Sequence, residues 1–184
     1  KHPFLFYFLA TLFPWTFWSI AAIISHTESN GSLLWQSIFA FAGLVAPNVI
    51  AFLLILQDKE LIADLLGRFF NFKTIKLKYW IITFFLMVIS ILLAQAVSLL
   101  FGYSADQFQF AKSFSFTSGL FPVWFILISA PFLEELAWHS YGSDCLRSRF
   151  SLFTTSIMFA LYWGIWHLPL SFIKDYYHSN LVET

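Results

Sequence analysis

Residues 33–57 read LLWQSIFAFAGLVAPNVIAFLLILQ and contain no Lys, Arg, Asp or Glu. A transmembrane helix needs about 20 consecutive apolar residues, so this stretch is long enough to cross the hydrocarbon of a bilayer. Further runs without formal charge occupy residues 3–25, 79–105, 119–133 and 150–173. Of the 184 residues, 59% are hydrophobic and only 11% are charged, a composition that excludes an ordinary soluble domain.

These runs predict an all-α fold, a polytopic transmembrane helical bundle, because lipid cannot satisfy exposed backbone groups. We place about five spans, in a single transmembrane domain, at residues 3–25, 34–56, 79–101, 120–138 and 151–173. Segment 58–78 carries apolar residues at helical spacing opposite charged ones, so we expect an amphipathic helix at the membrane interface. The first span follows Lys1 and His2 directly, and the sequence does not begin with an initiator methionine. We therefore expect a fragment whose C-terminal spans are missing.

The distribution of basic residues predicts the orientation in the membrane. Only Lys112 and Lys174 fall on one side of the predicted spans. The other basic residues fall on the opposite side: Lys1, Lys59, Arg68, Lys73, Lys76, Lys78, Arg147 and Arg149. The positive-inside rule therefore predicts a cytoplasmic N-terminus, and we expect a bacterial cell membrane as the location. The net charge of zero gives no indication of a nucleic-acid partner, and the single cysteine can form no internal disulfide.

Glu134 and Glu135 follow the apolar run that begins at Trp124. A charged residue at the centre of a membrane helix costs about 2.5–3.5 kcal/mol, so intramembrane acids are functional candidates. Residues four apart share a helix face, which aligns Glu134 with Trp138 and Glu135 with His139. The two acids point about 100° apart, so we expect them to have different roles. The alternative is that the helix ends here and both carboxylates reach the headgroups, although apolar residues continue past the pair.

A second candidate element is Trp163-Gly164-Ile165-Trp166-His167-Leu168-Pro169, in a span without formal charge. A lone histidine among aromatic rings is more often a packing residue than a ligand, but this one accompanies two acids. An imidazole can bind zinc or donate to an oxyanion, and a glutamate beside it can deprotonate water. Gly164 should permit close helix approach, and Pro169 should interrupt the helical hydrogen bonds. We expect Glu134 and His167 to approach each other within reach of one water or ion.

These motifs resemble the CPBP family of intramembrane metalloproteases, which includes the type II CAAX prenyl endopeptidases and bacteriocin-processing proteases. The family is marked by Glu-Glu-x-x-x-Arg on one membrane helix, an aromatic-x-x-x-His on the next and His-x-x-x-Asn or a variant on a later one. The chain has Glu134-Glu135-Leu136-Ala137-Trp138-His139, with histidine in place of arginine, and Trp163-Gly164-Ile165-Trp166-His167. No asparagine stands four residues after His178, so we expect the third motif beyond Thr184.

The resemblance implies an intramembrane endopeptidase that hydrolyses a peptide bond in a membrane-associated substrate, such as a prenylated protein or a leader peptide. It implies that Glu134 activates water, that Glu135 is a supporting or ligating carboxylate, and that His167 is a metal ligand or oxyanion stabiliser. Zinc held by Glu134 and His167 and a metal-independent glutamate mechanism both remain open. We expect supporting roles for His139, Trp138 and Trp163, and membrane lipids as partners.

Two other functions explain the same residues. The acids and histidines could form a proton relay in a proton-coupled transporter, a role that such groups serve within membranes. The chain could also be a catalytically silent relative that acts as a bacteriocin-immunity or scaffold protein. His139 favours this second alternative, because a histidine does not carry the permanent charge of the usual arginine. We rank the protease first, the silent protein second and the transporter third.

Overall fold

The computed structural model describes residues 2–27, 31–69, 75–109, 120–174 and 176. The α-helices, in chain order, are α1 (Pro3–Ser25), α2 (Ser32–Ile55), α3 (Lys59–Phe69), α4 (Leu77–Ser98), α5 (Val123–Ala137), α6 (Ser143–Arg147) and α7 (Leu152–Trp166). Shorter helical turns are η1 (Leu99–Phe101), η2 (Ala105–Phe108), η3 (Trp138–Gly142) and η4 (Leu168–Phe172). No strand occurs among the described residues, and the predicted all-α fold class is confirmed.

The chain divides into two compact units. One unit comprises Lys1–Ala63 and Ser115–Thr184, and the other comprises Asp64–Phe114. The first contains α1, α2, α5, α6 and α7, together with η3 and η4. The second contains α4, η1 and η2. All the candidate site residues belong to the first unit, so the site can be described within it.

Three of the described helical segments are long and apolar enough to cross a membrane: Pro3–Ser25, Ser32–Ile55 and Leu77–Phe101. The segments predicted as the fourth and fifth spans are also helical, but each is interrupted. Helix α5 passes into the π-helical turn η3 and then α6, whereas α7 is followed by the 3-10 helix η4. As a result, α5 and α7 are each 15 residues long. That all five segments cross the bilayer stays a prediction.

Helix α3 accounts for the first half of the predicted amphipathic segment. Asp58 accepts hydrogen bonds from the backbone N–H groups of Glu60 and Leu61, at 2.9 and 3.4 Å, and so caps the helix start. Arg68 near the end of the helix pairs with Asp64, at 2.7 Å. Residues 70–74 lie outside the described residues, and the placement of α3 at a membrane surface stays a prediction.

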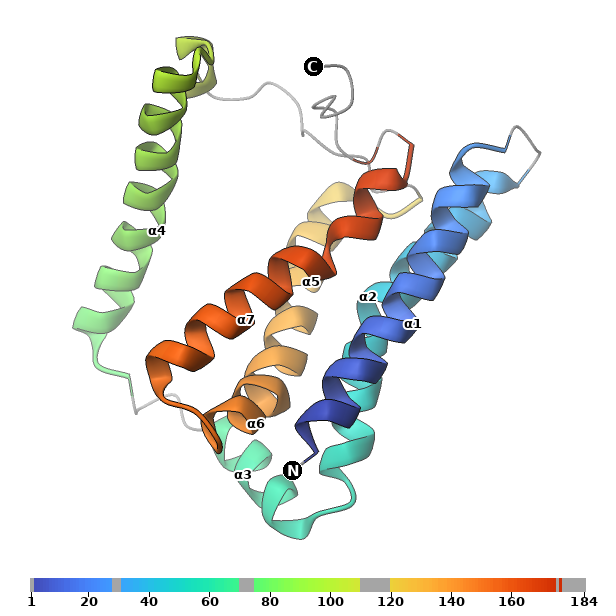
Figure 1. Ribbon diagram of the computed structural model, residues 1–184, viewed down its shortest axis with the longest axis vertical. Coiled ribbons are helices and arrows are strands. Elements are labelled where there is room, and N and C mark those ends of the chain that lie inside the picture. Colours follow the sequence, from blue (N-terminus) through green and yellow to red (C-terminus); the bar gives the residue numbers. More distant parts are fainter. Residues whose placement is uncertain (1, 28–30, 70–74, 110–119, 175, 177–184) are drawn as a thin grey trace. The chain divides into compact units, whose positions relative to one another are not determined.

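Helices α1 and α2 form a closely packed pair, against which α5, η3 and η4 also pack (Figure 1). The indole of Trp18 on α1 donates to the carbonyl of Ala40 on α2, at 3.0 Å. A β-carbon at Gly43 would collide with this indole, so glycine is required there. A β-carbon built at Gly164 meets no atom within 4 Å among the described residues, so the close approach predicted there stays a prediction.

Candidate functional site

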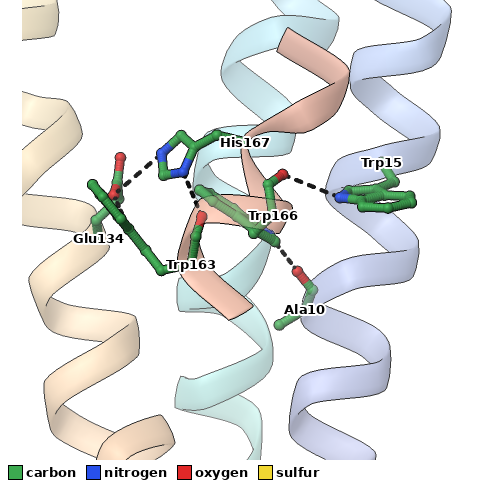
Figure 2. Close-up of polar contacts among 6 residues, drawn as sticks. All are labelled: Ala10, Trp15, Glu134, Trp163, Trp166 and His167. Carbon is green, nitrogen blue, oxygen red and sulfur yellow. Dashed lines mark hydrogen bonds and ion pairs between the residues drawn. The ribbon is translucent and has the colours of Figure 1, made fainter. Parts of the chain in front are cut away.

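Glu134 near the end of α5 and His167 directly after α7 face each other across the two helices. Nε2 of His167 lies 3.8 Å from Oε2 of Glu134, and the two side chains are 23% and 17% exposed. Figure 2 shows the imidazole directed at the carboxylate. The predicted approach of Glu134 and His167 is confirmed, and the distance is within the reach of one bridging water or ion.

Trp163 contacts both members of the pair. Its indole Nε1 donates a hydrogen bond to Oε2 of Glu134, at 2.9 Å, and its backbone carbonyl lies 2.7 Å from Nδ1 of His167 (Figure 2). A carbonyl oxygen can only accept, so Nδ1 is the donor and carries a proton. In neutral His167, Nε2 therefore presents a lone pair toward the carboxylate.

The space between the two side chains suits a donor of two hydrogen bonds. Nε2 of neutral His167 and Oε2 of Glu134 are both acceptors, and their separation of 3.8 Å is too long for a direct hydrogen bond. For a water oxygen about 2.8 Å from both atoms, the angle from Nε2 through the water oxygen to Oε2 would be roughly 90°, near the angle between the O–H bonds of water. The arrangement can therefore hold a water with one proton directed at each base.

The end of α7 positions the imidazole. Helix α7 stops at Trp166, and Pro169 lies in the 3-10 helix that follows, so the predicted break after the histidine is confirmed. The backbone N–H of His167 bonds to the carbonyl of Ile165, and the imidazole donates to the Trp163 carbonyl. The rings of Trp163 and Trp166 contact the imidazole edge-on, with centroids 4.4 and 4.9 Å away. These contacts restrict the orientation of His167.

The pair borders a cavity of about 220 Å³. Glu134 and His167 form part of its wall, and most of the remaining wall is apolar. Phe41 and Leu44 line it from α2, and Ile126 and Ala130 line it from α5. The cavity has room for several waters or for part of a bound peptide, since one water occupies about 30 Å³ of liquid. It belongs entirely to the first compact unit.

The second acid has different neighbours. Oε2 of Glu135 lies 3.3 Å from Nε2 of His139, one turn further along, so the predicted alignment of these residues is confirmed. The two side chains are 69% and 53% exposed, unlike the more buried Glu134. Glu135 thus pairs with His139 and takes no part in the Glu134–His167 contact.

Trp138 supports the site from the core. Its side chain is 1% exposed, and its ring packs edge-on against Trp166, 5.1 Å between centroids. No partner for its indole nitrogen is present among the described residues. Trp138 therefore supports the tryptophan that precedes His167, and sharing a helix face with Glu134 does not bring it into contact with the carboxylate.

The described residues do not form a complete zinc site. Catalytic zinc typically has three protein ligands, and no three His, Cys, Asp or Glu side chains in the described part of the chain lie close enough to hold one ion. For an ion about 2.1 Å from both Nε2 and Oε2, the angle between the two bonds would be roughly 130°, wider than tetrahedral coordination allows. His178 lies outside the described residues.

Trp15 on α1 is a further contributor that the sequence analysis did not single out. Its indole Nε1 donates to the backbone carbonyl of Trp166, at 3.1 Å, beside His167 (Figure 2). The two tryptophans are 151 positions apart in sequence, so helix periodicity carries no signal for the contact.

Comparisons with known proteins extend over the site and over nearly the whole chain. Residues 115–181 match the family described as type II CAAX prenyl endopeptidase Rce1-like. The chain is 40% identical over 178 residues to a protein of Methanococcus maripaludis named CAAX prenyl protease 2. The match includes 95% of this chain and 65% of that protein. The chain thus spans just under two thirds of the length of this relative.

Proposed function

Since the chain is a relative of the type II CAAX prenyl endopeptidases, as its motifs predict, we propose that it contributes the water-activating site of an intramembrane endopeptidase. One observation carries the proposal. The carboxylate of Glu134 and Nε2 of His167 converge, 3.8 Å apart, at the wall of a cavity in a membrane protein. Burying an acid and an imidazole in an apolar setting costs free energy, and this cost favours a functional role for the pair.

In the proposed reaction, Glu134 is the general base. Its carboxylate removes a proton from the bound water, and the water oxygen attacks the carbonyl carbon of the scissile peptide bond. The tetrahedral intermediate then breaks at the C–N bond, and Glu134 returns the proton to the departing amine. The indole of Trp163 keeps Oε2 of Glu134 directed at the water through its 2.9 Å hydrogen bond.

The role proposed for His167 follows from the proton on Nδ1. With Nδ1 bonded to the Trp163 carbonyl, neutral Nε2 has no proton to give to an oxyanion. It can accept the second hydrogen bond of the attacking water, and so orient the oxygen lone pair toward the substrate. The same lone pair is the form of histidine that binds a metal, but Glu134 and His167 alone do not complete a zinc site, so the proposed water activation uses only the carboxylate and the imidazole.

The substrate class follows from the setting of the cavity. Its wall combines apolar side chains with the Glu134–His167 pair, which suits a peptide that enters from the membrane rather than a free polar peptide. We propose a lipidated or leader-type peptide held at the membrane as the substrate. The related protein carries the name of a CAAX prenyl protease, which makes prenylated peptides the first to test.

The test is cleavage of prenylated and leader peptides by the full-length protein in lipid nanodiscs. Glu134→Gln should keep the fold and lower the rate about 10²–10⁴-fold, because glutamine cannot act as a base. The matched control is Glu60→Gln, which alters an exposed acid in the first turn of α3. Wild-type cleavage by Glu134→Gln would refute the mechanism. A wild-type protein that cleaves nothing, yet protects its host against a bacteriocin, would indicate a silent immunity protein.

A further inference from the structure

Where α1 meets the end of α7, two backbone carbonyls lack their usual helical donors. In an α-helix the carbonyl of one residue accepts from the N–H four residues later. For Ala10 that residue is Pro14, which lies inside α1 and has no N–H. Ala10 is fully buried, so an unbonded carbonyl would be costly.

The carbonyl of Trp166 has a similar deficit. The N–H of Leu170, four residues later, donates instead to the carbonyl of His167, at 3.0 Å. The residue three positions later is Pro169, which cannot donate in a 3-10 arrangement. The Trp166 carbonyl therefore lacks a donor from its own segment, directly beside the candidate catalytic histidine.

Each deficit is corrected by a tryptophan of the opposite helix. The indole of Trp166 donates to the Ala10 carbonyl, at 2.7 Å, and the indole of Trp15 donates to the Trp166 carbonyl, at 3.1 Å. Figure 2 shows both bonds on the side of Trp166 away from Glu134. Trp166 is thus bonded through its side chain and its backbone to the same helix, and this fixes the peptide unit that joins it to His167.

We infer that Trp15 is a positioning residue for His167. Trp15 acts through its hydrogen bond to the Trp166 carbonyl. The expected effect of Trp15 on cleavage rests on the proposed function, but its expected effect on the orientation of the imidazole does not. The Trp166 carbonyl belongs to the peptide unit whose nitrogen is that of His167, so a rotation of this unit would move the imidazole. A moved imidazole would lose the 2.7 Å bond from Nδ1 to the Trp163 carbonyl, which sets the tautomer.

The first test is Trp15→Phe, which keeps an aromatic ring but removes the donor. We expect kcat to fall about five- to tenfold with KM little changed, the loss of one positioning hydrogen bond. The control is Trp35→Phe, at a tryptophan of α2 that is 56% exposed. A second readout is the ¹⁵N NMR spectrum of labelled histidines in bilayers, with the His167 signal assigned from His167→Gln. Wild type should show the Nδ1–H tautomer, and Trp15→Phe a mixture.

Rescue separates positioning from general packing. Pro169→Ala restores an N–H three residues after Trp166, which can donate to the same carbonyl. In that background, Trp15→Phe should lower kcat less than about twofold. An unchanged tautomer or an unchanged kcat in Trp15→Phe, or an equal loss in both backgrounds, would overturn the inference. If the wild type cleaves nothing but Trp15→Phe still alters the tautomer, the proposed function fails and the positioning of His167 by Trp15 stands.

Discussion

Nε2 of His139 lies 3.3 Å from Oε2 of Glu135, so the acid next to Glu134 has a histidine partner of its own. Both side chains are more than half exposed, and exposed pairs of this spacing contribute little to stability. The family motif places an arginine where this chain has His139. The Glu135–His139 pair is therefore an exposed contact one helical turn apart rather than a second reaction centre.

We expect Glu135→Gln to lower the cleavage rate less than about tenfold, whereas Glu134→Gln lowers it about 10²–10⁴-fold. His139→Arg places a guanidinium beside Glu135, as in the family motif, and should retain full activity. Rates of all three variants, measured on one peptide, check the prediction. Equal losses for the two glutamates would show that Glu135 takes part in the chemistry.

Trp163→Phe should lower kcat about tenfold, because it removes the 2.9 Å indole hydrogen bond to Oε2 of Glu134. The backbone carbonyl that holds Nδ1 of His167 remains, so the tautomer of the histidine should be unchanged. Trp124→Phe is the control, since it changes a tryptophan of α5 that is 64% exposed. Steady-state kinetics with a fixed peptide measure the effect. A rate equal to that of wild type would show that Glu134 needs no support from the indole.

Trp138 offers a contrast between two substitutions. Trp138→Phe should be mild, because the indole nitrogen has no described partner to lose and phenylalanine fills most of the same space. Trp138→Ala should destabilise the protein by about 3 kcal/mol or more, because it empties a buried position that packs on Trp166. Thermal unfolding in detergent compares the two. A large loss in Trp138→Phe would indicate an unrecognised bond to the nitrogen.

The helical fold and the approach of Glu134 to His167 could both be predicted from sequence. Long runs without charge require helices in lipid, and an acid and a histidine in adjacent apolar segments need a partner. The pairing of Glu135 with His139 follows from helical spacing alone. These features depend on local periodicity or on the composition of single segments.

Other features depend on contacts between distant segments. The bonds of Trp15 and Trp166 join residues about 150 positions apart, and each corrects a break caused by a proline. The prolines are visible in the sequence, but the helix that supplies the missing donor is not. The prediction at Gly164 has a similar dependence, since a glycine permits close approach only if another helix packs there. Gly43 is such a position, because the indole of Trp18 covers it.

The orientation of the chain is open to a direct test. The positive-inside rule predicts that Thr27, after α1, is outside and that Ser148, between α6 and α7, is inside. The background is Cys145→Ala, which removes the one cysteine of the chain. In intact cells, an impermeant maleimide should label Thr27→Cys, and should label Ser148→Cys only after lysis. The reverse pattern would invert the predicted topology.

The final prediction concerns Glu134 and His167 as a unit. If they share one water, His167→Gln should lower kcat about 10²-fold, and adding Glu134→Gln should cost little more than the larger single loss. Independent roles would instead make the two losses multiply. A chelator added to the wild type distinguishes activation of the water by a metal from activation by the carboxylate and the imidazole alone. Loss of cleavage that zinc restores would show that the pair binds a metal with ligands from elsewhere, whereas unaltered cleavage would leave the carboxylate and the imidazole to activate water alone.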